Sequence, residues 1–125
     1  MTWRTTVDRS GLAGQKAERA AASFLARRGL AILARNYRSR WGEIDIIAAD
    51  KGDIVFVEVK YRRSSNFGGA LASITTSKKR KIGLTALDFL SRHPRYEHNI
   101  RFDIIVIEKK LTWIKAALNF DEANI

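Results

Sequence analysis

The sequence predicts a single α/β domain in which two main helices flank a mixed five-stranded sheet. Two stretches with apolar residues at helical spacing and five short runs rich in Ile, Val, Leu and Phe alternate in the order helix, three strands, helix, two strands. The chain has 125 residues, 46% of them hydrophobic, and a single proline, which suits one compact domain with a modest core. We therefore assign residues 1–125 to one domain and expect its ends, 1–10 and 117–125, to be peripheral or flexible.

The first helix is expected from Gly11 to Arg28, where the apolar positions follow helical spacing and Gly29 is a good terminator. Glu18 lies at the edge of the apolar stripe, and its neighbours three and four residues away include no basic residue. The usual explanation of a helical glutamate, an ion pair along its own helix, is therefore absent. Glu18 is left either as a surface residue or as the partner of a group outside the helix.

The stretch from Gly42 to Tyr61 is the most informative part of the chain. A strand is expected before it, at Leu30–Arg38, and the stretch itself contains two Ile- and Val-rich runs separated by Asp50-Lys51-Gly52-Asp53. That pattern is typical of two strands joined by a tight turn, and the simplest hairpin closes on Lys51-Gly52. Because lysine is a poor residue for the positive φ of a type I′ turn, a type I turn with a glycine bulge, which would shift the register by one residue, stays an alternative.

In the simplest register, one face of this hairpin carries four charged side chains at the end away from the turn. Asp45 lies opposite Glu58, and Glu43 lies opposite Lys60. Like charges opposite each other in a mostly apolar sheet are unfavourable, and one lysine cannot neutralise three carboxylates, whereas a divalent cation could help to do so. The pattern therefore predicts a metal site at this end. The other face is expected to carry Ile44, Ile46, Ala48, Val55, Val57 and Val59.

The second helix is expected from Ser77 to Ser91, and its first turn is strongly basic. Cations at a helix N-terminus oppose the macrodipole, so helix stability does not explain them, whereas free amide groups beside basic side chains form a good anion site. The loop after Lys60 adds two arginines among small residues and is suited to gripping a phosphate backbone. A solvated basic run and an ordinary connection are the alternatives. The expected nucleic-acid contacts are Arg62, Arg63, Lys78, Lys79, Arg80 and Lys81.

Two further strands are expected at Ile100–Ile107 and Leu111–Lys115. Asp103, on the first of them, is a candidate additional acid for the site, although pairing with Arg101 or another basic neighbour is the stronger expectation. Trp41, in the turn before the hairpin, is expected in the core rather than stacked on a base. Neither loop histidine receives a role.

The formal net charge of +10 is the second strong feature of the composition. A small protein this basic most often meets a polyanion, and nucleic acid is the commonest one; solubility charge or a ribosome-associated extension are the alternatives. There are no cysteines, which excludes disulfides and thiolate metal sites. No apolar run resembles a signal peptide or approaches the roughly 18 residues of a membrane span, so we expect a cytoplasmic protein without a membrane partner.

The combination of Glu18, Asp45 and Glu58-Val59-Lys60 resembles the PD-(D/E)xK nuclease superfamily. More specifically, over roughly residues 11–108 the chain looks like the YraN-like family of uncharacterised bacterial proteins. That family is similar in fold to archaeal Holliday junction resolvases, which implies a restriction-endonuclease-like core and is compatible with a homodimer. The proline of the superfamily motif is absent, with Ile44 in its place. The segments that carry the closer resemblance are Gly42-Glu43-Ile44-Asp45, Phe56-Val57-Glu58-Val59-Lys60 and Arg101-Phe102-Asp103.

The resemblance implies Mg²⁺- or Mn²⁺-dependent hydrolysis of phosphodiester bonds in DNA, with branched or structured DNA among the substrates. Asp45, Glu58 and the Val59 backbone carbonyl would hold the metal. Glu18 would complete the outer shell or bind a second ion, and Lys60 would orient or help to deprotonate the attacking water. Two alternatives stay open: a catalytically silent nucleic-acid-binding protein that retains the nuclease fold, and a scaffold protein whose acidic patch is a salt-bridge cluster.

Overall fold

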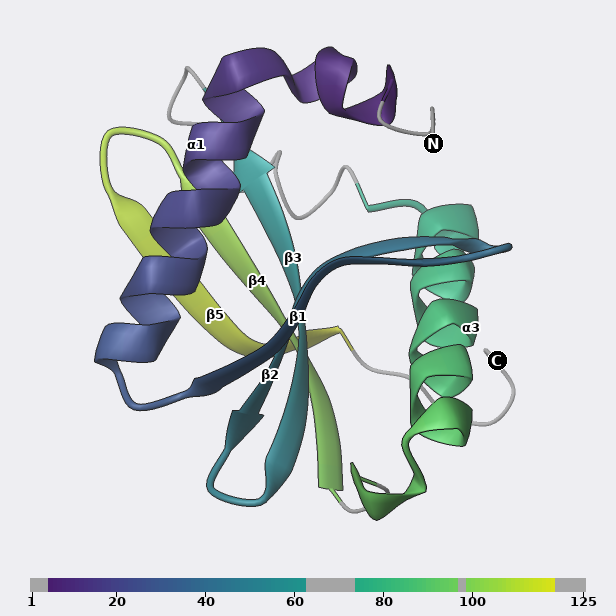
Figure 1. Cartoon of the computed structure of the whole chain (residues 1–125). Coiled ribbons are helices and arrows are strands. Elements are labelled where there is room, and N and C mark those ends of the chain that lie inside the picture. Colours follow the sequence, from purple (N-terminus) through teal and green to yellow (C-terminus); the bar gives the residue numbers. More distant parts are fainter. Residues whose placement is uncertain (1–4, 63–73, 97–98, 119–125) are drawn as a thin grey trace.

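The computed structural model describes residues 5–62, 74–96 and 99–118, with the backbone alone for residues 5–10. A five-stranded sheet carries one main helix on each face (Figure 1), so the predicted α/β fold with two flanking helices is confirmed. The predicted contacts of Arg63 and the expectations for residues 119–125 lie outside the described residues. The elements are α1 (Thr5–Arg27), β1 (Ala31–Ser39), β2 (Gly42–Asp50), β3 (Asp53–Tyr61), α3 (Thr76–Arg92), the 3₁₀ turn η2 (Pro94–Tyr96), β4 (Asn99–Ile107) and β5 (Leu111–Leu118).

The sheet has the strand order β1-β2-β3-β4-β5 and is mixed, as predicted. Neighbouring strands are antiparallel except β3 and β4, which run parallel because α3 forms the crossover between them. The 3₁₀ turn after α3 was not expected from the sequence. Within the described residues, no helix combines the length and hydropathy needed to cross a membrane.

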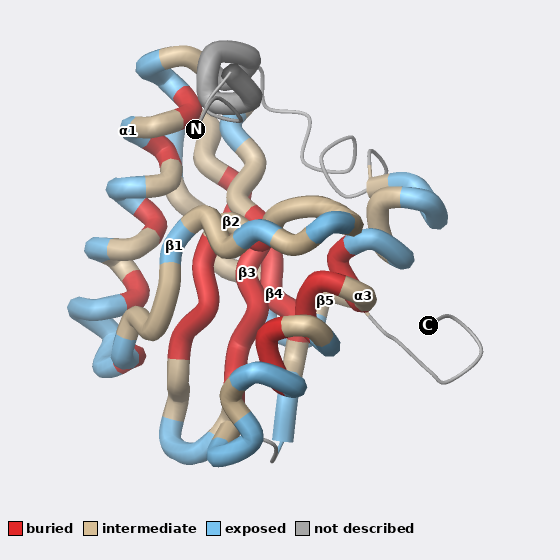
Figure 2. Tube along the Cα trace, turned by 45° about the vertical axis from the view of Figure 1, so that its right-hand side comes forward, coloured by how far each residue is buried: buried red, intermediate tan, exposed pale blue. Residues whose placement is uncertain are grey.

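Two apolar layers hold the helices against the sheet. Under α1, Leu25 packs on Ile46 and Val57, and under α3, Phe89 packs on Phe56. Both faces of the central strands are therefore buried (Figure 2), which explains why β3 reads as a continuous apolar run rather than as an alternating one.

The β2–β3 turn has the predicted register. Lys51 and Gly52 have positive φ values of 55° and 97°, as a type I′ turn requires, and the pairing runs from Asp50–Asp53 to Ile46–Val57. The alternative with a glycine bulge is thus not formed. The Arg101 guanidinium, 3.0 Å from Asp50 and 3.5 Å from Asp53, holds both strands beside the turn.

The predicted alternation of faces is wrong at the far end of β2. Ile44 lies in the core under α3 together with Ile47, whereas Ile46 and Ala48 lie on the α1 side. An uninterrupted strand would place Ile44 with Ile46. The strand therefore changes its facing near Asp45.

A side-chain hydrogen bond accompanies this irregularity. The pairing of β2 with β3 stops at Ile46, and the Asp45 Oδ2 atom accepts a hydrogen bond of 2.8 Å from the Val59 amide. Asn36, on the neighbouring stretch of β1, has a left-handed φ of 53°. From this point the β1–β2 hairpin leaves β3 and extends toward α3 (Figure 1).

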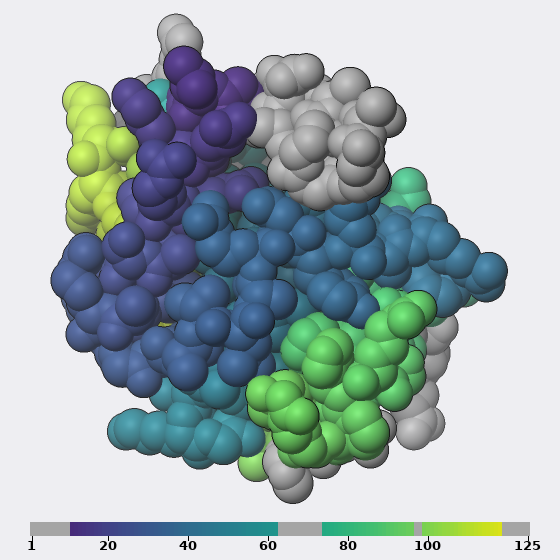
Figure 3. All heavy atoms as spheres, in the orientation of Figure 1, coloured from purple at the N-terminus to yellow at the C-terminus, as the bar shows by residue number. Residues whose placement is uncertain are grey.

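The outer part of the β1–β2 hairpin rests on α3. Ser39 Oγ lies 2.8 Å from Thr85 Oγ1, and the Tyr37 hydroxyl donates a 2.5 Å hydrogen bond to Asp88. In the space-filling view the atoms of this hairpin cross the molecule and reach the surface above α3 (Figure 3). The hairpin, β3 and the start of α3 consequently enclose a space between them.

Candidate functional site

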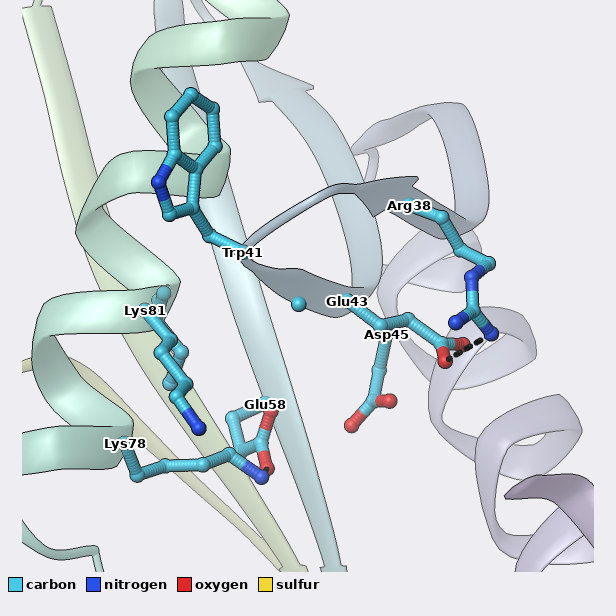
Figure 4. A pocket seen from close by; sticks show the side chains of 9 residues that line it. Arg38, Trp41, Glu43, Asp45, Glu58, Lys78 and Lys81 are labelled. Atoms are coloured by element: carbon cyan, nitrogen blue, oxygen red, sulfur yellow. Dashed lines mark ion pairs between the residues drawn. The ribbon is translucent and has the colours of Figure 1, made fainter. Parts of the chain in front are cut away.

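A polar cavity of about 270 Å³ occupies the place where the β1–β2 hairpin leaves β3. Three elements contribute side chains: the hairpin supplies two carboxylates, β3 supplies one, and the first turns of α3 supply two lysines (Figure 4). The lining residues are Arg38, Trp41, Gly42, Glu43, Asp45, Glu58, Lys78, Lys81 and Ile82.

Asp45 and Glu58 lie together at this cavity. Glu58 is 8% exposed, and Asp45 is half-buried at the wall of the cavity. Burial raises the pKa of the Asp45 carboxyl well above its ordinary 3.8, the negative charge of Glu58 raises it further, and Glu18 and Glu43 add smaller contributions. The Val59 amide acts in the opposite direction because it donates to the carboxylate. The carboxylate of Asp45 is therefore repelled by the neighbouring carboxylates, most strongly by that of Glu58.

Two lysines contact Glu58. Lys78 Nζ is 3.1 Å from Glu58 Oε2, and Lys60 Nζ is 3.7 Å from the same atom. Lys60 was predicted beside these acids, but Lys78 was predicted only as a phosphate contact. Thr75 caps α3 by accepting the Lys78 amide at 3.0 Å, and the helix start therefore holds Lys78 near β3.

Asn36 is a member of the site that was not predicted from the sequence. Its side-chain amide donates one 2.9 Å hydrogen bond to Glu18 and another to Glu43, so it links α1 to the hairpin. Glu43 also lies 3.8 Å from Arg38, and the β2–β3 pairing ends before the predicted Glu43–Lys60 pair would form. The signal in the sequence was an asparagine inside a strand-like run, because asparagine tolerates the left-handed φ that Asn36 adopts.

Asp103 belongs to the core beneath β5 rather than to the cavity. It is fully buried and accepts hydrogen bonds from Arg101 Nε at 3.1 Å, from Trp113 Nε1 at 2.9 Å and from the Ala116 amide at 2.9 Å. The expectation that Asp103 pairs with Arg101 is confirmed, and the alternative of a further acidic ligand is not supported.

Three of the other basic residues predicted at the interface, Lys79, Arg80 and Lys81, lie in the first turns of α3. Lys81 is exposed at the rim of the cavity, and Arg80 is exposed beside it. Lys79 is half-buried in the same turn, and the backbone amide of Arg62 donates to the Ile107 carbonyl at 2.9 Å. The lysines that line the cavity with Asp45 and Glu58 therefore come from α3.

The donor set fits a hard divalent cation that keeps part of its water shell. Within the part of the chain that the structure describes, no three Asp, Glu or His side chains are close enough together to hold an ion. Mg²⁺ commonly uses only one or two carboxylates and several waters, and Asp45 and Glu58 supply such a pair. A cation between them would offset the repulsion that raises the Asp45 pKa. Glu58 would exchange its contact with Lys78 for the ion.

Comparison with known proteins identifies relatives over most of the chain. The family model described as "Uncharacterised protein family UPF0102" matches residues 17–107. A UPF0102 protein of Dechloromonas aromatica (strain RCB) is 46% identical over 110 residues, which cover 87% of this chain and 90% of the relative. A UPF0102 protein of Psychromonas ingrahamii is 47% identical over 107 residues, covering 83% and 87%. One from Coxiella burnetii is 40% identical over 111 residues, covering 86% and 92%.

Proposed function

The chain belongs to the uncharacterised protein family UPF0102, the YraN-like family that its motifs resemble, and from the geometry of its site we propose that it is a metal-dependent endonuclease that hydrolyses phosphodiester bonds in DNA. The observation that carries this proposal is the pair of carboxylates, Asp45 and Glu58, at one polar cavity of a chain with a net charge of +10. Carboxylates alone repel phosphate. With a divalent cation between them they would attract it.

Each residue of the site has a separate role in the proposed hydrolysis. Asp45 and Glu58 would hold Mg²⁺ or Mn²⁺, with the Val59 carbonyl as a further predicted ligand, and the bound ion supplies charge for a phosphate oxygen and a more acidic water. Glu18, held by Asn36, would bind waters of the outer shell or a second ion. Lys60 would orient the attacking water and stabilise the negative charge that develops on the phosphate.

The start of α3 would bind the substrate backbone. Lys78 and Lys81 line the same cavity as the two acids, and Arg80 is exposed in the same turn. A phosphate drawn into the cavity would compete with Glu58 for the Lys78 amine, since both are anions within its reach. Release of Glu58 from Lys78 would make that carboxylate available to the ion, so binding of DNA and binding of metal would support each other.

The proposal is tested by incubating the full chain with branched, duplex and single-stranded DNA, in Mg²⁺, Mn²⁺ or EDTA. We expect cleavage only with metal, and loss of cleavage in Glu58→Ala and Lys60→Ala. Asp53→Asn is a matched control, because Asp53 is an acid of the same strand that does not line the cavity. Metal-independent nicking, or variants as active as the wild type, would refute the assignment.

A catalytically silent nucleic-acid-binding protein is the second candidate, and the contacts of Glu58 favour it. Two lysines already neutralise this carboxylate at 3.1 and 3.7 Å, so the cluster is partly satisfied without an ion. This function predicts salt-sensitive binding that is lost when the basic first turn of α3 is neutralised, without cleavage in any metal. Calorimetric titration with Mg²⁺ separates a metal site from a salt-bridge cluster, and sedimentation tests the homodimer.

A further inference from the structure

A second concave site adjoins the cavity that holds Asp45 and Glu58. Its volume is about 610 Å³, within the range of about 300–1,000 Å³ that is typical of small-molecule sites. It shares Arg38 and Trp41 with the first cavity, so the outer part of the β1–β2 hairpin forms the wall between the two. The residues that line it are Tyr37, Arg38, Ser39, Arg40, Trp41, Asp88 and Arg92.

Trp41 is the aromatic surface of this second site. Its position in the sequence predicts a core residue, but Trp41 is only half-buried and belongs to none of the core clusters of the described residues. Its side chain extends from the hairpin turn away from Asp45 and Glu58 (Figure 4). The Arg40 guanidinium lies 4.7 Å from the centroid of its ring. An aromatic ring and a guanidinium thus stand together at the second cavity, and the same ring also lines the first.

The wall that carries Trp41 is held in place by hydrogen bonds. Ser39 Oγ accepts the Trp41 amide at 3.0 Å and lies 2.8 Å from Thr85 Oγ1 on α3. On the other side, the Tyr37 hydroxyl donates to Asp88, and burial together with Asp88 raises the pKa of Tyr37 to about 12. Tyr37 is protonated at neutral pH and can donate to Asp88, so hydrogen bonds on both sides hold the hairpin turn against α3.

The charge of the second site favours an anion. Three arginines line it against a single carboxylate, Asp88. Arg92 pairs with Asp88 at 3.2 Å, and Arg38 lies 3.8 Å from Glu43, outside this site. The lining therefore keeps an excess of positive charge, in which Arg40 stands over the Trp41 ring. Proteins that bind single-stranded nucleic acid combine such cationic side chains with an aromatic ring on which a base stacks. A base inside a continuous duplex is covered on both faces by its neighbours and cannot use the ring in this way.

We propose that the second cavity binds an unpaired nucleotide next to the scissile phosphate, with its base on Trp41 and its phosphate on Arg40. The inference rests on the proposed function for the position of the scissile phosphate in the first cavity. It narrows the substrate to nucleic acid that offers at least one unstacked nucleotide beside the cleaved bond. The two cavities share a wall, so adjacent nucleotides of one strand reach both.

Equilibrium binding in EDTA tests the subsite without requiring catalysis. Fluorescence anisotropy of the full chain is measured with a labelled single strand and with the same sequence as a duplex, for wild type, Trp41→Leu and Trp41→Phe. Loss of one base–aromatic stack should weaken single-strand binding roughly 5- to 150-fold in Trp41→Leu, whereas duplex binding should change little. Trp41→Phe keeps an aromatic face and should retain most of the affinity. If the leucine variant does not fold, the phenylalanine variant still allows the contribution of the aromatic ring to be measured.

The arginine has a matched control. Arg95 also lies over an aromatic ring, with its guanidinium 4.8 Å from the centroid of Tyr96, but it lines neither cavity. Arg40→Ala and Arg95→Ala have the same net charge, so a larger loss in Arg40→Ala supports a local contact. Equal losses in the two variants would mean that only overall charge matters and would contradict the subsite.

The outcomes for the two proposals are separable. A Trp41→Leu variant that binds single strands as tightly as wild type, or that loses single-strand and duplex affinity by the same factor, overturns the subsite even where metal-dependent cleavage is present. Absence of cleavage together with the selective Trp41 effect removes the endonuclease and leaves the subsite. A single-stranded RNA of the same sequence forms the last arm: a selective loss there as well supports the subsite and extends it to ribonucleotides.

Discussion

Substitution of Asn36 tests whether this residue holds the acidic side chains of the site together. Its amide donates to Glu18 and Glu43 at 2.9 Å each, from a backbone with φ of 53°. A hydrogen bond to a charged group contributes about 1.5–3 kcal/mol, and partial exposure of the carboxylates favours the lower end, so the two bonds together would contribute about 3 kcal/mol before hydration is considered. Because the released carboxylates regain water, we expect Asn36→Gly, which keeps the left-handed backbone accessible, to lose about 2 kcal/mol of unfolding free energy.

Asn36→Ala should lose more, since alanine also resists the left-handed conformation by about 1 kcal/mol. For a domain of this size, about 3–5 °C of melting temperature accompanies each kcal/mol. The expected decreases are therefore about 6–10 °C for glycine and about 9–15 °C for alanine, measured by thermal and urea unfolding. Metal-dependent cleavage should also decline in Asn36→Gly, because Glu18 loses its tether. A glycine variant as stable as wild type, or equal losses in both variants, would refute the reasoning.

Three further predictions concern the charged groups. Because burial and neighbouring carboxylates raise the Asp45 pKa above the ordinary 3.8, the folded state holds more protons than the unfolded state, and wild-type stability in EDTA should fall as pH rises from 3.8 through the folded pKa. Asp45→Asn has no ionisable carboxyl at this position, so its stability should lack this dependence on pH. Its side chain can still accept a hydrogen bond from the Val59 amide, so the variant should be more stable than wild type at neutral pH. Urea unfolding from pH 3.8 upward measures both profiles, and identical profiles would contradict the prediction. Asp103→Ala leaves Arg101 and Trp113 without their buried acceptor and should lower the free energy of unfolding by about 3–5 kcal/mol. The Asp53 side chain is 38% exposed and 3.5 Å from Arg101, so Asp53→Ala should lower it by less than about 1 kcal/mol. Similar urea midpoints for the two variants would argue against a structural role for Asp103. Lys78→Met should tighten Mg²⁺ binding by calorimetry, because Glu58 loses its closer cation, and should weaken DNA binding by anisotropy; if neither affinity changes, the 3.1 Å pair does not persist in solution.

The β2–β3 hairpin shows which features of the structure can be predicted from the local sequence pattern. The register followed from two apolar runs around Lys51-Gly52, and the structure has the pairing that this turn dictates. Proximity of Asp45 and Glu58 followed in turn, because a hairpin register determines which residues approach across the strands. The change of facing at Asp45 did not follow, because it involves a hydrogen bond between a side chain and the backbone of the next strand. Such a bond competes with regular pairing and leaves no periodic signal.

The partners of the site residues came from distant parts of the chain. Lys78 was expected to face phosphate, yet it reaches Glu58 because α3 packs beside the end of β3. Trp41 was expected in the core, yet the hairpin that carries it extends beyond the sheet and leaves its ring at the wall of two cavities. Asn36 carried only the weak signal of an asparagine within a strand pattern. None of these contacts joins residues that are neighbours along one element.

The sequence alone predicted the order of helices and strands, the turn of the central hairpin and most of the acidic and basic residues that line the cavity. These features depend on near neighbours, since side-chain periodicity and turn chemistry act over a few residues. The tertiary structure decided which charges meet, where the hairpin separates from β3 and which aromatic ring lines the two cavities. Those outcomes depend on the packing of α1, β1 and α3 around β2 and β3, where one long-range contact constrains the next, and no local pattern records that arrangement.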